Sequence, residues 1–183
     1  MNTSVSSDRL LKLGEEVVNC LNCGEKSFRI RLFVYDVPYF GKVLLEVGTC
    51  DKCGFRRSDV SILEVSEPIR IVVKVTSDKE LNALVVKSST ASIYIPELGI
   101  EITPGPAAPG YITTVEGILH RVLDHIPSEC FDEKSHCYFK VKEIKDAIDG
   151  KIPFTLIIED PFGRSDVKGE GANIVKERLN VKE

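Results

Sequence analysis

The feature that most constrains this chain is a pair of Cys-x-x-Cys-Gly motifs, "CLNCG" from Cys20 to Gly24 and "CDKCG" from Cys50 to Gly54. Two residues between thiolates let one tight turn direct both sulfurs at a single ion, and the glycine lets the chain leave the turn with a positive φ. Four thiolates complete a tetrahedral structural zinc site with no open position for water. The motifs therefore predict one structural Zn²⁺ per chain, bound by Cys20, Cys23, Cys50 and Cys53. The alternative, two redox pairs or unrelated thiols, fits less well because redox Cys-x-x-Cys motifs come singly.

The arm between the motifs has the pattern of a β-hairpin. Two runs alternate apolar and polar residues, from Phe28 to Val34 and from Val43 to Val47. We therefore expect a zinc ribbon over residues 15–60, preceded by a flexible segment over residues 1–14. The tip of the hairpin is unusually aromatic, and aromatic residues in a turn either fold onto a neighbouring core or are held out for a partner. In the second case the partner surface would be formed by Tyr35, Pro38, Tyr39 and Phe40.

Charge and hydropathy exclude several classes of protein. The formal net charge is -4, and the segment from residue 20 to 59 holds seven basic and five acidic residues. Four thiolates on a divalent zinc contribute about -2, so the ribbon is close to neutral and a nucleic-acid role is disfavoured. No apolar run has the length of a signal peptide or of a transmembrane helix. We expect a cytoplasmic protein without membrane contacts.

The rest of the chain, residues 61–178, reads as a mainly β domain. Short β-branched segments such as "IRIVVKV" and "FTLIIED" are separated by prolines and by "TPGPAAPG", which indicates a sandwich or barrel. Two segments have helical periodicity instead. The first begins with a capping box formed by Thr113 and Glu116, and the second covers about Lys134 to Asp149 and stops at Gly150. A helical hairpin at about 113–150 is thus inserted into the β-domain.

Together, the two knuckles, "VPYFGKVLLEV", "CDKCGFRRSDV", "LNALVVKSSTASIYIPELGIEITPG", "YITTVEGIL" and "PFTLIIEDPFGRSDV" resemble the ZPR-type zinc-finger family over most of the chain. The resemblance implies a four-cysteine zinc ribbon followed by a double-stranded β-helix, a jelly-roll-like domain that carries a helical hairpin. Eukaryotic members have two such modules, whereas this chain has one and is similar to the archaeal form. The family-like residues Asp160, Pro161 and Ser165 bring no assigned chemistry, and the segment around them reads as an Asp-Pro turn between strands.

The resemblance also implies a partner, translation elongation factor 1-alpha, the GTPase for which eukaryotic members act as binder and folding chaperone. For a chain with one module, either that module suffices, the protein forms a homodimer, or the function differs. The principal alternative is a zinc-ribbon adaptor that binds nucleic acid.

A third function class, a metal or small-molecule enzyme in the β-domain, would need imidazoles and a carboxylate converging from strands. The only histidines are His120, His125 and His136, and all three are expected to be exposed residues of the helical hairpin. We therefore expect a non-enzyme. The remaining cysteines, Cys130 and Cys137, flank the turn of the helical hairpin, where they could approach each other, but free thiols are the favoured interpretation unless the source is a hyperthermophile.

Overall fold

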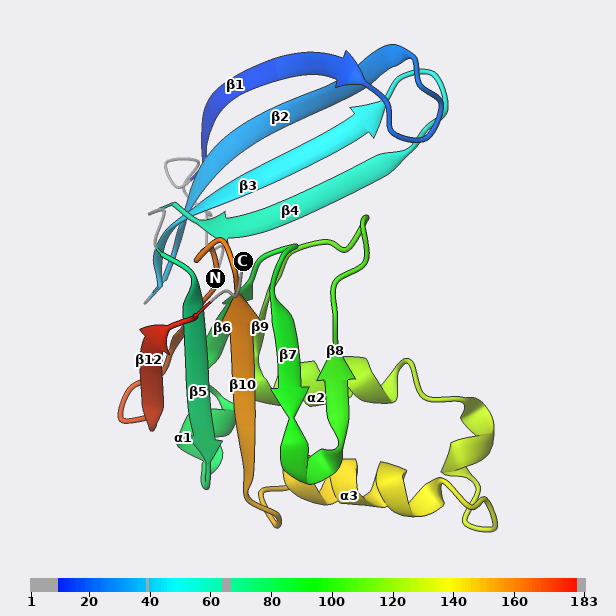
Figure 1. The fold of residues 1–183 in the computed structure, drawn as a ribbon, viewed down its shortest axis with the longest axis vertical. Helices are drawn as coiled ribbons and strands as arrows, with labels where there is room; N and C mark the ends of the chain where they lie inside the picture. Colours follow the sequence, from blue (N-terminus) through cyan, green and yellow to red (C-terminus); the bar gives the residue numbers. More distant parts are fainter. Residues whose placement is uncertain (1–9, 39, 64–66, 181–183) are drawn as a thin grey trace, which may run out of the picture.

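The N-terminal part of the protein is a four-stranded antiparallel sheet. The computed structural model describes residues 10–38, 40–63 and 67–180. Strands β1 (Leu10–Asn19), β2 (Lys26–Val37), β3 (Gly41–Cys50) and β4 (Arg56–Ile62) pair in the order β1-β2-β3-β4 (Figure 1). The predicted flexible segment is wrong for residues 10–14, which are the first half of β1 and pair with β2. The expected boundary at residue 60 also falls inside β4.

The two faces of this sheet bury different apolar clusters. Phe28 pairs with Cys50 across the β2–β3 hairpin, so one face packs Phe28 against the cysteine end of the ribbon. Val43 pairs instead with Tyr35 and Ile62, and on this opposite face Val43 is fully buried against the β-domain. The two alternating runs of the hairpin therefore serve two separate cores.

The C-terminal part is a jelly roll of two antiparallel sheets, as the sequence predicted. The larger sheet has the order β12-β5-β10-β7-β8 and the smaller one β11-β6-β9. The strands are β5 (Ile69–Val75), β6 (Leu84–Lys87), β7 (Ser92–Ile95), β8 (Ile100–Ile102), β9 (Tyr111–Thr114), β10 (Phe154–Asp160), β11 (Asp166–Lys168) and β12 (Ile174–Arg178). A four-residue helix, α1 (Asp78–Leu81), and a 3₁₀ turn, η2 (Pro96–Leu98), connect strands.

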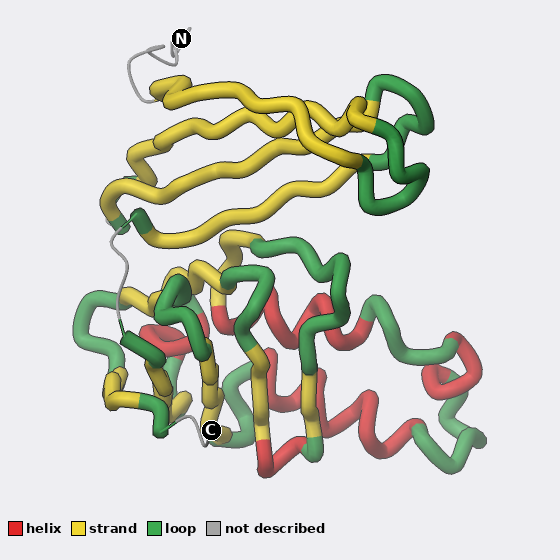
Figure 2. The backbone as a smooth tube through the Cα atoms, turned by 45° about the horizontal axis from the view of Figure 1, so that its top comes forward, coloured by secondary structure: helices red, strands yellow, loops and turns green. Residues whose placement is uncertain are grey.

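The predicted helical hairpin is present, with different ends. It consists of α2 (Val115–Leu123), a 3₁₀ turn η3 (Ser128–Phe131) and α3 (Tyr138–Ile148), and the two α-helices lie side by side (Figure 2). The predicted Thr113 cap is wrong, because the hydroxyl of Thr114, the last residue of β9, accepts the hydrogen bond from the Gly117 N–H. Gly150 follows α3 with φ of 70°, as expected of a helix stop.

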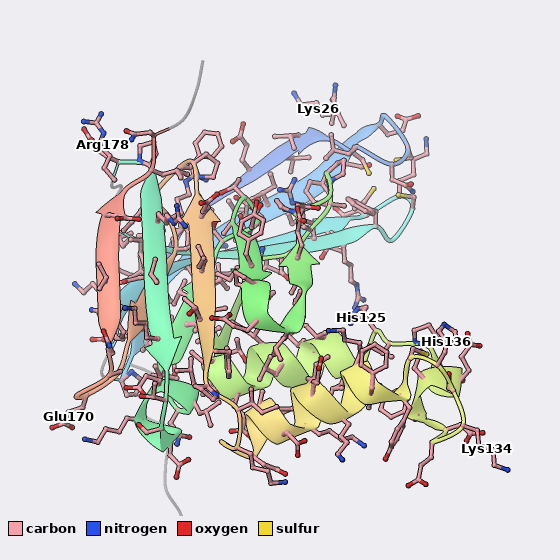
Figure 3. The ribbon with its side chains drawn as sticks, turned by 60° about the horizontal axis from the view of Figure 1, so that its bottom comes forward. Lys26, His125, Lys134, His136, Glu170 and Arg178 are labelled. Atoms are coloured by element: carbon pink, nitrogen blue, oxygen red, sulfur yellow. A yellow bond between two sulfur atoms is a disulfide. The ribbon has the colours of Figure 1, made fainter. Side chains whose placement is uncertain are left out.

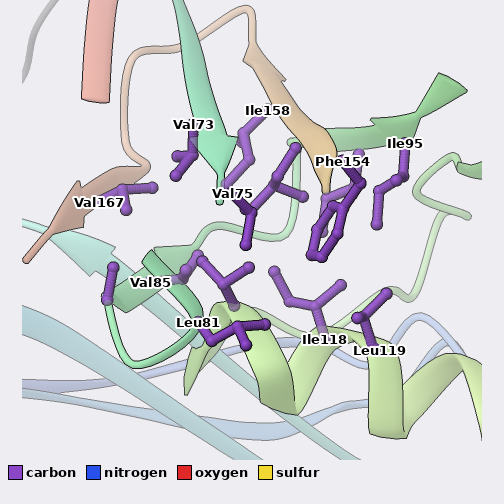
Figure 4. Packing of buried hydrophobic residues seen from close by; sticks show 14 of the residues in the cluster. Val73, Val75, Leu81, Val85, Ile95, Ile118, Leu119, Phe154, Ile158 and Val167 are labelled. Atoms are coloured by element: carbon purple, nitrogen blue, oxygen red, sulfur yellow. The ribbon is translucent and has the colours of Figure 1, made fainter. Parts of the chain in front are cut away.

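Helix α2 closes the open side of the jelly roll. Its Ile118 and Leu119 are fully buried and face side chains from both sheets, among them Val75 and Phe154 from the larger sheet and Val85 from the smaller one (Figure 4). Burying a large aliphatic side chain contributes about 1.5–3 kcal/mol, so this cluster is a main source of stability for the β-domain. None of the helices in the described part of the chain is long and apolar enough to cross a membrane.

Candidate metal centre and its surroundings

Each Cys-x-x-Cys-Gly motif forms the same tight turn. In the first, between β1 and β2, the Gly24 N–H donates to the Cys20 carbonyl at 2.8 Å; in the second, after β3, the Gly54 N–H donates to the Cys50 carbonyl at 3.0 Å. The two glycines have φ of 75° and 73°, in the left-handed region that only glycine adopts freely. The sequence therefore predicted both the turns and the reason for their glycines.

The turns bring the four predicted ligands together. The Sγ atoms of Cys20, Cys23, Cys50 and Cys53 all lie within 4.8 Å of one another. The Cys20–Cys53 and Cys23–Cys50 sulfur pairs are 3.7 and 3.8 Å apart. A tetrahedral site with Zn–S bonds of about 2.3 Å has sulfur–sulfur edges of about 3.8 Å, so the cluster fits a zinc ion. All four ligands are cysteines, which leaves no coordination position for a substrate and marks a structural site.

Neighbouring polar groups favour the thiolate form of two of the cysteines, Cys50 and Cys53, whereas burial and the other three cysteine side chains raise the pKa of Cys23 to about 11. The Ser27 hydroxyl lies 3.1 Å from the Cys50 sulfur, and together with the Cys53 N–H it lowers the pKa of Cys50 to about 6. The Asn22 side-chain amide lies 3.5 Å from the Cys53 sulfur and lowers its pKa in the same way. Sequence reasoning missed Ser27 and Asn22, although their positions beside the cysteines are a signal, because residues next to ligands commonly orient them.

An aromatic ring covers the inner side of the site. Phe28 is 4% exposed and lies 5.8 Å from Phe55, measured between ring centres. The ring of Phe28 extends over Gly48, which pairs with Ile30 across the hairpin, and a Cβ atom on Gly48 would stand only 2.2 Å from the ring. A larger residue at position 48 would therefore displace the ring from the cysteines.

Comparison with protein families identifies this arrangement. The ZPR1 zinc-finger domain matches residues 15–65, and the ZPR1 jelly-roll domain matches residues 79–183. The chain belongs to the ZPR1 zinc-finger family. Membership confirms the resemblance found in the sequence, including the order of ribbon and jelly roll.

Archaeal members are similar to this chain over most of its length. A ZPR1-like protein of Methanocaldococcus jannaschii is 44% identical over 160 residues, covering 84% of this chain and 81% of the relative. A ZPR1-like protein of Pyrococcus horikoshii is 38% identical over 182 residues, covering 94% and 78%. The zinc finger chaperone zpr1 of Schizosaccharomyces pombe is 33% identical over 177 residues, 90% of this chain but only 37% of that protein. This ZPR1-family chain thus spans about a third of its fission-yeast relative.

The sequence left two interpretations of the aromatic hairpin tip open, and for Phe40 the structure supports packing onto a core. Phe40 is only 5% exposed and packs with Val43 and Val86, so the alternative in which Phe40 is held out for a partner is wrong. The tip folds onto the β-domain, where the Lys168 ammonium donates to the Phe40 carbonyl at 2.6 Å. Tyr35 is half-buried beside the same cluster, Pro38 is exposed, and Tyr39 lies outside the described residues.

A buried polar network ties the turn after β10 to the β6–β7 loop. Asp160 is fully buried and accepts five hydrogen bonds, from the hydroxyls of Ser88, Thr90 and Ser165 and from the N–H groups of Phe162 and Arg164. Burial alone would raise the pKa of Asp160, but these donors outweigh it and hold the pKa below the ordinary value. The family-like Asp160 and Ser165 thus have a structural role, which an Asp-Pro turn alone did not indicate.

The histidines and the spare cysteines gather at the helical hairpin. His120, His125 and His136 are exposed, and His125 and His136 lie at its outer end (Figure 3). Cys130 and Cys137 form a disulfide across the turn between the helices, so the prediction of free thiols is wrong. The turn η3 and the segment before α3 bring the two residues to a Cα–Cα distance of 5.0 Å, and α3 begins at Tyr138, directly after Cys137, rather than at the predicted residue 134.

Proposed function

We propose that each chain binds one zinc ion through its four cysteines and that the ion keeps the ribbon folded. The proposal is supported by the tetrahedral spacing of the sulfurs and by the zinc-finger family. Metal binding in such sites is coupled to folding, so chelation should unfold the ribbon while the β-domain survives. Elemental analysis should find one zinc per chain in the wild type and none in a Cys50→Ser, Cys53→Ser variant. Iron in the wild type, or zinc retained by the variant, would contradict the proposal.

We further propose that the protein is a cytoplasmic protein-interaction module that binds the translation elongation GTPase, elongation factor 1-alpha, and assists its folding. The observation that carries this proposal is family membership through both domains in the family's order, with one relative named a zinc finger chaperone. A ribbon fixed at one end by zinc and at the other by Phe40 offers a rigid surface, which lowers the ordering cost of binding.

Two alternative functions receive less support. A nucleic-acid adaptor would need a row of free cations along the ribbon, but three of its seven basic residues are paired: Arg29 lies 2.6 Å and Arg31 3.6 Å from Glu15, and Lys52 is paired with Glu25. A metal enzyme in the β-domain would need converging imidazoles, whereas the three histidines are exposed on the helical hairpin. We therefore keep the non-enzymatic, protein-binding role as the proposal.

The test is a titration of the zinc-loaded protein with the elongation GTPase of the same organism. Calorimetry measures the binding, and light scattering measures the mass of the complex. We expect a stable complex at about 150 mM salt, and the mass of the complex will show whether one module or a homodimer binds. The Cys50→Ser, Cys53→Ser variant is the control and should bind weakly. Absence of a complex with the wild type, together with submicromolar binding of an oligonucleotide at the same salt, would favour the adaptor instead.

A further inference from the structure

A second candidate site lies where the ribbon meets the β-domain. It is a pocket of about 460 Å³ between β4, the β6–β7 loop, the β8–β9 loop and the turn after β10. The long β8–β9 loop reaches from the jelly roll toward the ribbon sheet (Figure 1), so both parts of the protein contribute walls. Its walls include the side chains of Arg57, Ser89, Thr90, Pro104, Pro106 and Phe162.

Arg57 brings a cation to this pocket without a countercharge. Its Nε atom is buried and has no hydrogen-bond partner, and among the described residues no carboxylate forms an ion pair with it. Because the Nε atom is closed to solvent, a ligand in the pocket would meet the terminal Nη atoms of the half-buried Arg57, and a carboxylate is the acceptor that best matches guanidinium geometry. An incoming carboxylate would therefore supply the countercharge that the described residues do not give Arg57.

The nearby carboxylates already serve other donors. Asp59 accepts the Ser89 hydroxyl at 2.5 Å and the Ser89 N–H at 3.1 Å, and Asp160 accepts the Thr90 hydroxyl at 2.8 Å. Since both hydroxyls donate to these aspartates, each offers a ligand only its oxygen lone pairs, and the Thr90 oxygen also lies 2.9 Å from the Ser88 hydroxyl. The hydroxyls can thus accept N–H groups, and they would repel the oxygens of a phosphate.

The remaining wall is apolar and open. Pro104, Pro106 and Phe162 all line the pocket, and Phe162 is 57% exposed. The Arg164 guanidinium lies 5.7 Å from the centre of the Phe162 ring and forms no ion pair among the described residues. A chain segment that carries an apolar side chain next to a carboxylate would match this combination.

We propose that the pocket binds a short acidic peptide segment of a partner protein. One carboxylate of the segment pairs with Arg57, an adjacent apolar side chain packs on the prolines and Phe162, and backbone N–H groups donate to Ser89 and Thr90. The proposal rests on the protein-binding role proposed above, but it does not depend on which protein is bound.

The test uses a fluorescent peptide of sequence Glu-Leu-Glu-Phe-Glu-Leu, with blocked ends, and the zinc-loaded full chain. The matched control is Arg56→Gln, because Arg56 is the exposed neighbour of Arg57 on the opposite face of β4. Anisotropy titrations should show at least about tenfold weaker binding for Arg57→Gln, since a charge-assisted hydrogen bond is lost. Arg56→Gln should change the affinity by less than about twofold, and a peptide with Gln in place of Glu should bind Arg57→Gln and the wild type equally.

Further measurements keep the proposal falsifiable. Phe162→Ala removes an exposed ring, so it should weaken peptide binding while the unfolding midpoint stays that of the wild type. Equal losses in Arg56→Gln and Arg57→Gln would overturn the proposal, as would displacement of the peptide by inorganic phosphate at millimolar concentration, which would indicate a simple anion site. Because the peptide assay does not contain the GTPase, a failure here is distinguishable from a failure of GTPase binding.

Discussion

Replacement of Asp160 by asparagine should destabilise the β-domain strongly, although the two side chains have almost the same size. Oδ2 accepts the hydroxyls of Ser88 and Ser165 and the Arg164 N–H, whereas Oδ1 accepts the Thr90 hydroxyl and the Phe162 N–H. An asparagine fits best with its NH₂ at the Oδ1 position, where the Thr90 hydroxyl can turn to accept. The Phe162 N–H then loses its acceptor.

The expected cost follows from these contacts. The three donors that face Oδ2 keep an acceptor, but a neutral one, which weakens each bond by about 1 kcal/mol. The unsatisfied Phe162 N–H costs about 1–3 kcal/mol more, and the lower cost of burying a neutral amide offsets part of the loss. We expect Asp160→Asn to lower the free energy of unfolding by about 3 kcal/mol, a large part of the roughly 5–15 kcal/mol typical of a domain.

Urea denaturation of the zinc-loaded protein at pH 7, followed by far-UV circular dichroism, measures this cost. The control is Glu159→Gln on the same strand, whose half-exposed carboxylate lies 3.6 Å from Arg70 and should contribute less than about 1 kcal/mol. A cost for Asp160→Asn within about 1 kcal/mol of the control would refute the assignment of the network as a source of stability.

The wild type and Asp160→Asn should also differ in how their stability depends on pH. The hydrogen bonds hold the pKa of Asp160 below its ordinary value of 3.8. A carboxyl group whose pKa is lowered on folding contributes stability above the unfolded pKa, and this contribution is lost as the pH falls through the folded pKa. The advantage of the wild type over Asp160→Asn should therefore be constant from pH 7 down to about 4 and shrink below that. An advantage that shrinks between pH 7 and 5 would point to another group.

Two further predictions concern the junction and the helical hairpin. Gly110→Ala should lower the free energy of unfolding by at least about 2 kcal/mol, because its Cβ would stand 2.2 Å from the Asp59 carboxylate and 2.6 Å from the Val60 carbonyl. The control is Gly105→Ala, which has open space around the added Cβ and should leave the denaturation midpoint unchanged. The disulfide closes a loop with a sequence separation of 7, so a Cys130→Ala, Cys137→Ala variant should lose about 2–3 kcal/mol of its free energy of unfolding, measured by thermal unfolding without reductant. Adding reductant to the wild type should cause an equal loss. An unfolding midpoint of the variant equal to that of the wild type would contradict the prediction.

Local patterns in the sequence predicted the site better than they predicted the ends of elements. The Cys-x-x-Cys-Gly spacing determines both turns through contacts within five residues, such as the bond from the Gly54 N–H to the Cys50 carbonyl. The capping rule failed by one residue because Thr113 and Thr114 both suit a helix start. Both threonines pair with β6 in the smaller sheet, Thr113 with Val85 and Thr114 with Leu84, so the strand runs to Thr114 and the helix begins only after it. This end point depends on a contact between segments far apart in the chain.

The burial of the hairpin tip also depends on contacts with distant parts of the chain, which the local sequence does not show. An aromatic turn looks identical in sequence whether it meets a core or a partner, and the residues that bury Phe40 come much later in the chain: Val86 packs against it, and the Lys168 ammonium lies 4.9 Å from its ring centre. Because Phe40 is buried, zinc would act on partner binding through the position of the ribbon and not by displaying the Phe40 ring. A zinc ion on the four cysteines would order one end of the ribbon, and Phe40 attaches the other end to the jelly roll. The ribbon contributes Arg57 and the β-domain contributes Phe162 to the walls of one pocket. A partner that contacts both walls would then depend on Phe40 through the position of the ribbon rather than through contact with the ring itself.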